Sequence, residues 1–346
     1  MKKSVKKALG ILIALLLILV ALSASLLIIN KPKDRTDNTF VVVKIKEGSS
    51  TNDIAKELYK KGVISSVSKY KLVSKIWRYD GKYKAGSFSV SPSMRSSDIA
   101  QTIVKGVSST KTFTIPEGYT IEQTATKLDK EGIVNKDKFL EIAKHGDFSK
   151  FSFLKGAQSG DNHLEGYLYP DTYAVDLVAD ETQVITTMLN QYDKVFTKKY
   201  KKRAKELNLS ENEIIIIASL IERESQYDGD RAKIASVIYN RIKAGMPLQI
   251  DATIQYALGK PKENLSIADT KIDSPYNTYT NKGLPPGPIC SPGKASIKAA
   301  LYPESTDYLY YVVSEKLDGT HNFSKDYNKF LKDKEAYSKA LAEKNK

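Results

Sequence analysis

Residues Ile214 to Tyr227 have the sequence Ile-Ile-Ile-Ile-Ala-Ser-Leu-Ile-Glu-Arg-Glu-Ser-Gln-Tyr, and this stretch decides the fold of the second half of the chain. The four residues before it, Ser-Glu-Asn-Glu from Ser210 to Glu213, have the spacing of a capping box. In that motif the serine hydroxyl and the glutamate carboxylate satisfy free amides at a helix start. The sequence therefore predicts an almost wholly apolar helix that begins just after Ser210.

Two glutamates, Glu222 and Glu224, stand near the end of this helix. At about 100° per residue, Glu224 falls on the apolar stripe of the helix, and Glu222 lies nearly opposite. A carboxyl on an apolar wall is harder to ionise, so it can stay protonated near neutral pH and act as a general acid. Glu224 is the better candidate acid and Glu222 the alternative. In the competing interpretation both are ordinary helix glutamates, one paired with Arg223 or Arg231 and the other solvated.

The N-terminus has the pattern of a membrane anchor. Residues Ala8 to Ile29 are 22 residues without a charge, which is enough to cross a hydrocarbon core of about 30 Å as a helix. A cleaved signal peptide is the alternative because Ala21 to Ser25 are small, but the apolar run exceeds the usual length of its apolar part. Lysines at positions 2, 3, 6 and 7 place residues 1–7 in the cytoplasm. We therefore expect a single-pass protein of the cell membrane, with everything after residue 30 outside.

The part of the chain beyond the anchor is basic. It holds all 40 acidic residues and all but the four N-terminal lysines of the 54 basic ones, which leaves a formal charge of +10. Such a surface attracts anionic polymers or lipid head groups. The lysines are scattered and form no recognised nucleic-acid motif, so we expect no nucleic-acid partner. The single Cys290 excludes an intramolecular disulfide, and His145, His163 and His321 lack metal-ligand spacing, so we predict neither a metal site nor a cofactor.

A polar linker, residues 30–39, leads to an internal repeat with an offset of 70 residues. Val43-Lys-Ile-Lys-Glu-Gly48 recurs as Phe113-Thr-Ile-Pro-Glu-Gly118, and Gly62 recurs as Gly132. Each copy predicts a short strand, a Glu-Gly turn, an amphipathic helix and a glycine stop. We therefore expect two similar small α+β units between residues 40 and 160. The stretch from Gly48 to Ala55 resembles a LysM glycan-binding module, and a spacer of similar topology is the alternative.

Several candidate groove residues follow from residue 161 onward. Aromatic residues surround Glu165 in the stretch from Leu164 to Tyr173, which suits either a groove wall or a buried turn. A long polar helix is expected over residues 181–207. A second helix is expected over residues 230–244, with Asn240 near its end.

The stretch Met246 to Thr253 predicts an extended piece in which period-two alternation places Gln249, Asp251 and Thr253 on one side. Asp251 is also expected to be the N-cap of a helix over residues 252–258.

Two proline-containing loops follow, residues 274–279 and 283–293. Rigid loops with tyrosines and amides can stack on sugar rings and bind N-acetyl groups at a low ordering cost. A purely structural loop is the alternative. The candidate binding residues in the first of these loops are Tyr276, Asn277, Thr278 and Tyr279.

From about Val41 to the end, the chain resembles the endolytic murein transglycosylases of the MltG (YceG-like) family. The resemblance rests on the motifs LEGYLYPDTY, ASLIERES, VIYNRIKAGMPLQIDATIQYALG, SPYNTYTNKGLPPGPICSPG and SIKAALYP, in this order. It implies an α+β fold with one N-terminal transmembrane helix, a LysM-like small α+β region, and an α+β lytic transglycosylase domain over residues 161–346 with a charged helical tail. Within IERES the catalytic acid of the family maps to Glu224, with Glu222 as the alternative. The groove residues implied are Asn240, Gln249, Asp251, Tyr276, Asn277, Thr278 and Tyr279.

The resemblance implies a reaction on peptidoglycan glycan strands. Glu224 would protonate the oxygen that leaves C1 of N-acetylmuramic acid and would then deprotonate the C6 hydroxyl of the same sugar, which leaves a 1,6-anhydro end without the use of water. Internal cuts in newly made strands near the membrane are implied, where proteins of wall synthesis would be potential partners. Two alternatives stay open. One is a muramidase that uses water, with Asp251 or Glu222 as second carboxylate, and the other is a non-catalytic wall-binding scaffold.

Overall fold

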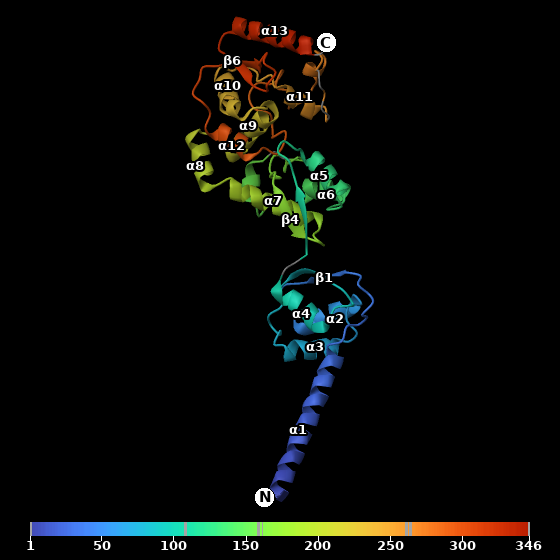
Figure 1. Ribbon diagram of the computed structural model, residues 1–346. Coiled ribbons are helices and arrows are strands. Elements are labelled where there is room, and N and C mark those ends of the chain that lie inside the picture. The colour runs from blue at the N-terminus through green and yellow to red at the C-terminus, as the bar shows by residue number, and fades with distance from the viewer. Residues whose placement is uncertain are drawn as a thin grey trace. The chain divides into compact units, whose positions relative to one another are not determined.

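A computed structural model describes residues 2–106, 109–157, 160, 162–259, 262 and 265–344 (Figure 1). The chain divides into two compact units, and the predicted α+β class is confirmed. The first unit comprises Met1–Lys111 and Ala174–Ala179, and the second comprises Thr112–Tyr173 and Asp180–Lys346. The chain therefore first changes unit between Lys111 and Thr112. The described strands form three two-stranded sheets, which pair β1 (Val41–Ile45) with β2 (Gly86–Val90), β3 (Thr110–Thr114) with β4 (Thr172–Asp176), and β5 (Tyr310–Val313) with β6 (His321–Ser324).

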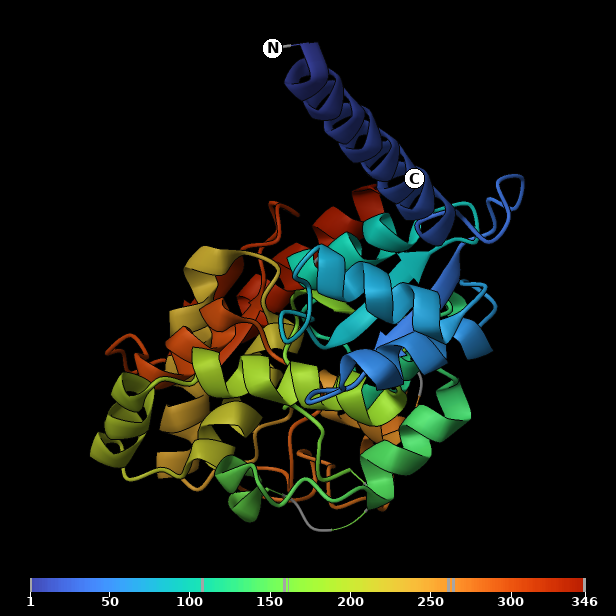
Figure 2. The ribbon, with the colours of Figure 1, turned by 90° about the horizontal axis from the view of Figure 1, so that it is seen from below.

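The first unit begins with the long helix α1 (Lys2–Ile29), which is straight and extends away from the other elements of this unit (Figure 2). Within the described residues, α1 is the one helix whose length and composition suit a membrane span, over Leu12–Ile29 with a mean hydropathy of 3.1. The side chains of that window are not buried within the protein. An exposed apolar helix at an N-terminus is consistent with an anchor or with a signal sequence.

The rest of the first unit packs three helices against a two-stranded antiparallel sheet. Val43 of one strand lies opposite Phe88 of the other, and both are fully buried in the core. The helix that follows the first strand begins with a capping box, in which the Ser50 side chain accepts a hydrogen bond from the amide of Asp53. The elements are β1 (Val41–Ile45), α2 (Thr51–Lys60), α3 (Val67–Ile76), β2 (Gly86–Val90) and α4 (Ser96–Lys105).

The second copy of the repeat forms β3 (Thr110–Thr114) and α5 (Ile121–Lys130). The turn glycines Gly48 and Gly118 have φ of 75° and 77°, a region that favours glycine, so the predicted strand, turn and helix are confirmed in both copies. The two copies differ in their partners. The strand of the second copy pairs with β4 (Thr172–Asp176), and its helix belongs to the second unit. The second copy is thus built into the same unit as the candidate acid.

The predicted single helix over residues 181–207 is wrong, because the structure has two helices there. The first, α7 (Glu181–Val195), ends at the buried Phe196. The hydroxyl of Thr197 then accepts a hydrogen bond from the amide of Tyr200 and starts α8 (Lys198–Glu206). A threonine that caps a new helix favours a break at this position.

Helix α9 (Glu211–Glu224) lies at the centre of the second unit (Figure 1). The predicted capping box of Ser210 and Glu213 is present, and all eight residues from Ile214 to Ile221 are buried. A helix can bury side chains all round only when other elements surround it. The remaining elements of this unit are α6 (Lys136–His145), η1 (Ser152–Gly156), η2 (Asp228–Asp230), α10 (Arg231–Lys243), α11 (Asp251–Ala257), η3 (Asp269–Lys271), α12 (Lys294–Leu301), β5 (Tyr310–Val313), β6 (His321–Ser324) and α13 (Tyr327–Lys344).

Candidate active site

Glu224 is the last residue of α9 and lies partly buried where the apolar helix reaches the surface. Burial raises the pKa of its carboxyl to about 7, although a hydrogen bond from Tyr311 opposes this shift. The negative charge of Asp251 raises the pKa further, and Arg223 lowers it. A carboxyl that is half protonated near neutral pH can both donate and accept a proton during one reaction.

Tyr311 is the direct partner of this carboxyl. Its hydroxyl donates a 2.8 Å hydrogen bond to Oε2 of Glu224 from strand β5, although the two residues are 87 positions apart. The edge of its ring meets the His321 ring at 5.6 Å between centroids. Asp230 holds that histidine in turn, because its Oδ2 accepts a 2.7 Å hydrogen bond from the backbone amide of His321 and lies 3.2 Å from Nδ1. The sheet thus fixes the phenol that orients the acid.

Asp251 lies near Glu224, but it does not cap α11. It is the first residue of α11 rather than its N-cap, and the N-cap Ile250 makes no side-chain capping bond. The Asp251 carboxylate instead accepts a hydrogen bond from the Tyr279 hydroxyl. The predicted capping role is therefore wrong, because a phenol from the loop 274–279 satisfies this carboxylate. Asp251 is exposed and Tyr279 is half-buried, so both can reach a ligand.

Arg241 of α10 connects the two segments that carry these groups. Its Nε donates a 2.7 Å hydrogen bond to the carbonyl of Leu309, just before β5. Its Nη1 donates to the carbonyl of Leu248 at 2.7 Å and to Oε1 of Gln249 at 3.4 Å. Gln249 itself is exposed and has a φ of 54°, an uncommon value outside glycine. This guanidinium therefore fixes the distance between the strand of Tyr311 and the loop before Asp251.

Glu222 occupies a different environment on the other side of α9. Its Oε2 accepts a 2.9 Å hydrogen bond from the amide of Gly293, and its Oε1 lies 3.4 Å from Nη1 of Arg231. Its side chain is only 7% exposed. Burial and the charge of Glu222 together raise the pKa of the neighbouring Glu117. Glu222 therefore takes part in a structural ion pair, as the competing interpretation of the two glutamates expected for one of them.

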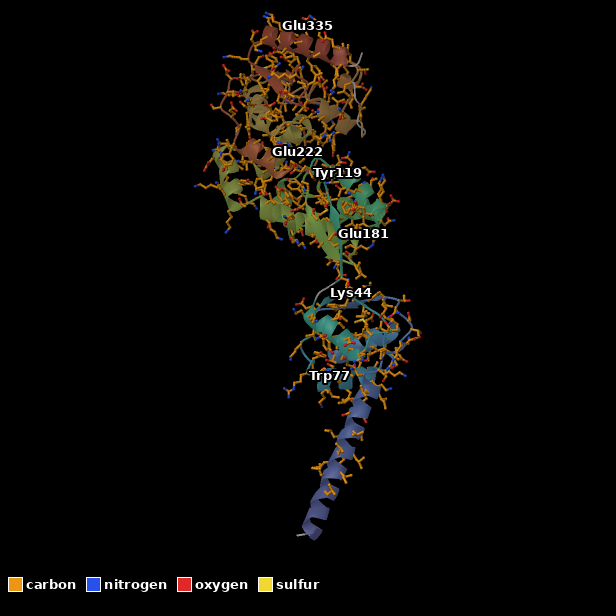
Figure 3. The ribbon with its side chains drawn as sticks, viewed as in Figure 1. Lys44, Trp77, Tyr119, Glu181, Glu222 and Glu335 are labelled. Carbon is orange, nitrogen blue, oxygen red and sulfur yellow. The ribbon has the colours of Figure 1, made fainter. Side chains whose placement is uncertain are left out.

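The same region joins the second repeat copy to the loop 283–293. The amide of Gly118 donates to the carbonyl of Ser291 at 2.9 Å, and the amide of Ser291 donates to the carbonyl of Tyr119 at 2.8 Å. Figure 3 labels Tyr119 of this junction and Glu222 of α9, whose Oε2 accepts the hydrogen bond from the Gly293 amide of the same loop. On the α9 side, the amide of Ile289 donates to the Ser219 hydroxyl at 3.1 Å. These hydrogen bonds hold the loop 283–293 against α9 and the second repeat copy.

Four of the predicted groove residues hydrogen-bond within the protein, and three of them, Thr253, Asn277 and Thr278, are buried. Asn277 is fully buried, and its amide donates to the carbonyls of Thr270 and Ile272 at 3.1 and 2.8 Å. Thr253 and Thr278 are buried and lie 2.9 Å apart between their hydroxyl oxygens. The predicted alternation ends at Ile250 because α11 begins at the next residue, and this places Thr253 inside. The fourth residue, Asn240, donates to the carbonyls of Thr306 and Tyr308. These hydrogen bonds give each of the four side chains a structural role, and their expected part in substrate binding stays a prediction.

Tyr276 and Glu165 lie together with Tyr256 in a second part of the unit. The rings of Tyr276 and Tyr256 are 4.8 Å apart between centroids. The Glu165 carboxyl is 3% exposed and accepts hydrogen bonds from the Ile121 amide at 3.2 Å and from the Tyr256 hydroxyl at 3.3 Å. Burial raises the pKa of Glu165 to about 8 despite these donors. Glu165 is therefore a mostly protonated acid at neutral pH.

The structure adds two residues that the sequence did not indicate, Tyr311 and Arg241. Tyr311 lies in a Tyr-Tyr-Val-Val strand whose pattern predicts only a sheet. Arg241 follows Asn240 at the end of a predicted helix, where a basic side chain is commonly a helix-dipole partner. In the described part of the chain, no group of three or more His, Cys, Asp or Glu side chains has an arrangement that could hold a metal ion.

Comparisons with known proteins identify the family of this chain. The model of the YceG-like family matches residues 43–336. An endolytic murein transglycosylase of Bacillus subtilis (strain 168) is 35% identical over 325 residues, which cover 91% of this chain and 89% of the relative. The enzyme of the same name from Streptococcus pneumoniae serotype 2 is 35% identical over 81% of this chain and 55% of its own length. A crystal structure of a YceG-like protein from Listeria monocytogenes superposes with a TM-score of 0.59 at 35% identity, and covers 85% of this chain and 99% of that one.

Proposed function

The chain belongs to the YceG-like family, and from this premise we propose that it is a lytic transglycosylase that cleaves the glycan strands of peptidoglycan. The relatives named endolytic murein transglycosylase support the substrate and the class of reaction. The observation that carries the proposal is the Glu224 carboxyl, whose pKa burial raises to about 7 and whose Oε2 binds the Tyr311 hydroxyl. A single carboxyl of this kind can serve as acid and then as base.

In the proposed reaction, Glu224 donates its proton to the glycosidic oxygen that leaves C1 of N-acetylmuramic acid. The C1–oxygen bond breaks through an oxocarbenium-like transition state. The Glu224 carboxylate then takes the proton of the C6 hydroxyl in the same sugar, and that oxygen bonds to C1. The product is a 1,6-anhydro end, and the carboxyl recovers its proton. Water is neither consumed nor released.

Asp251 and Tyr279 are proposed to act on the developing positive charge at C1. The Asp251 carboxylate is exposed and already influences the pKa of Glu224. A fixed negative charge near C1 stabilises an oxocarbenium ion. The hydrogen bond from the Tyr279 hydroxyl holds this carboxylate in one orientation. Gln249, which is exposed beside Asp251 in the chain, is proposed to contact the N-acetyl group of the substrate.

Hydrolysis by a muramidase is the second candidate function, and Asp251 is the residue that favours it. Hydrolysis with inversion or retention uses two carboxyl groups across the glycosidic bond. Asp251 would then activate water or act as nucleophile. Glu222 is a poor candidate for this second role, because Arg231 and the Gly293 amide already bind its two oxygens.

We further propose that α1 is an uncleaved anchor with residues 1–7 in the cytoplasm and the second unit outside. The apolar window Leu12–Ile29 and the lysines before it support this topology. The formal charge of +10 beyond the anchor would favour anionic wall polymers and lipid head groups. A reporter that is active only outside the membrane, fused after Lys346, should be active, and the mature protein should begin at Met1 or Lys2. A mature N-terminus near Ala24 would contradict the anchor.

The LysM-like stretch from Gly48 to Ala55 is proposed to support glycan binding near the membrane, where internal cuts in new strands would occur. A non-catalytic scaffold would bind wall glycan by this part alone. The test is the length distribution of purified glycan strands after incubation with the full chain or with Glu224→Gln. The proposal predicts shortened strands with the wild type and intact strands with the variant, whereas a scaffold would leave the strands intact in both.

A further inference from the structure

A cavity of about 450 Å³ lies in the second unit beside the candidate active site. Side chains from α5, α6, α9 and α11 line it. Its apolar surface includes Leu140, Ala143, Ala252 and Ile289, and this surface could accept small aliphatic groups. The cavity does not include Glu224, so it is a separate site from the reacting carboxyl.

Two chain neighbours connect this cavity to the active site. Arg223 lines the cavity and directly precedes Glu224. Ala252 lines it and directly follows Asp251. Consecutive Cα atoms are about 3.8 Å apart. Two independent elements, α9 and α11, therefore each supply a lining residue of the cavity that is the chain neighbour of a carboxyl group of the active site.

The charges of the cavity favour an anionic ligand. Arg223 is exposed, and no carboxylate of the described residues lies within ion-pair distance of its guanidinium. The buried Glu165 also lines the cavity, and its pKa of about 8 keeps most of its population neutral at pH 7. Glu122 is paired with Lys136 at 2.6 Å. Lys144 lines the cavity as well. The Arg223 guanidinium is the cation that adjoins Glu224 in the chain, and its planar group can bind a carboxylate with two hydrogen bonds.

We propose that this cavity binds the peptide stem of the glycan substrate, with Arg223 as the partner of a stem carboxylate. The inference rests on the proposed function. In peptidoglycan, the stem is attached through a lactyl ether to the same muramic acid whose C1 would react at Glu224. A substrate with C1 at Glu224 therefore carries its stem close to the rim formed by Arg223 and Ala252. Small apolar stem side chains suit the Ala143 and Ala252 surface.

The test compares two forms of one substrate. Uncrosslinked glycan strands are used with their stems intact and after removal of the stems by an amidase. The full chain is assayed as wild type, as Arg223→Gln, as Arg223→Lys, and as Lys298→Gln, which removes an exposed charge on α12 outside the cavity. We expect Arg223→Gln to raise KM about tenfold on stem-bearing strands, the scale of a charged hydrogen bond. We expect kcat to change little, Arg223→Lys to recover part of the loss, and Lys298→Gln to match the wild type.

The ratio of kcat/KM on the two substrates shows whether Arg223 binds the stem or acts through Glu224. An equal loss on both substrates would mean that Arg223 acts through Glu224, and no loss on either would mean that the stem does not bind here. Both results would overturn the inference and leave the proposed function intact. A wild type that cuts neither form would instead overturn the proposed function. As a measurement without a variant, muramyl dipeptide with a free carboxylate should inhibit the wild type at least tenfold better than its amidated form, and equal inhibition would contradict the proposal.

Discussion

The Tyr311 hydroxyl donates a 2.8 Å hydrogen bond to Oε2 of Glu224, and this bond opposes the effect of burial on the acid. Burial disfavours the carboxylate, whereas a donated hydrogen bond favours it. The balance leaves the pKa of Glu224 at about 7. The Tyr311 phenol on β5 thus lowers the pKa that burial alone would give to the Glu224 carboxyl at the end of α9.

Replacement of Tyr311 by phenylalanine should raise the pKa of Glu224 above 7, because the donor that favours the carboxylate is lost. A general acid works in its protonated form, so kcat/KM of the wild type should fall as the pH rises through about 7. In Tyr311→Phe this fall should move to higher pH. Tyr310→Phe is the matched control, since its ring can still face Arg241. An unchanged or lower midpoint in Tyr311→Phe would show that the hydrogen bond does not set this pKa.

Glu222→Gln should lower the free energy of unfolding and leave the catalytic turnover unchanged. The variant removes the negative charge beside Arg231 but can still accept the hydrogen bond from the Gly293 amide. We expect a loss of roughly 1 to 3 kcal/mol in the free energy of unfolding, measured by urea denaturation. Turnover per folded molecule should stay near that of the wild type. Loss of turnover in Glu222→Gln together with an active Glu224→Gln would transfer the role of the acid to Glu222.

Asn277→Ala should also act on stability rather than on turnover. The change leaves the carbonyls of Thr270 and Ile272 without their donor, at a cost of roughly 1 to 3 kcal/mol. The control is Asn281→Ala, which removes an exposed amide from the adjacent turn and should cost less. Normal stability with a selective loss of turnover in Asn277→Ala would instead support the predicted role of Asn277 in substrate binding.

The raised pKa of Glu165 should make the free energy of unfolding depend on pH. Its pKa is about 8 in the folded protein and 4.5 in a solvated reference. The folded state therefore holds this proton more tightly, and stability is lost as the pH rises from about 4.5 to about 8. Glu165→Gln cannot ionise, so its stability relative to the wild type should increase by roughly 3 to 5 kcal/mol between pH 4 and pH 9. Parallel melting curves across this range would contradict the assignment.

The sequence predicts local features of this fold well. The capping box at Ser210 and Glu213, the apolar helix after it, and the strand, turn and helix of both repeat copies are confirmed. These features depend on residues a few positions apart, so their patterns are visible in the chain. The placement of Glu222 and Glu224 on different sides of α9 follows from helix geometry alone.

Features that depend on distant pairing were not predictable in the same way. Tyr311 reaches Glu224 across 87 positions, and no local pattern marks that contact. Asp251 has the local sequence of a helix N-cap, but the Tyr279 phenol satisfies its carboxylate instead. Asn277 lies in a loop rich in polar residues, and its side-chain amide donates hydrogen bonds to the backbone carbonyls of Thr270 and Ile272. In each case a tertiary contact outweighs the local preference.

The central claim is that Glu224 forms an anhydro end without water. The direct measurement is mass spectrometry of the new ends after purified peptidoglycan is digested by the full chain in water enriched in oxygen-18. We expect 1,6-anhydro-muramyl ends that are lighter by one water than reducing ends and contain no oxygen-18, and we expect Glu224→Gln to produce none of them. New reducing ends that carry oxygen-18 would contradict this mechanism and would identify the protein as a hydrolase.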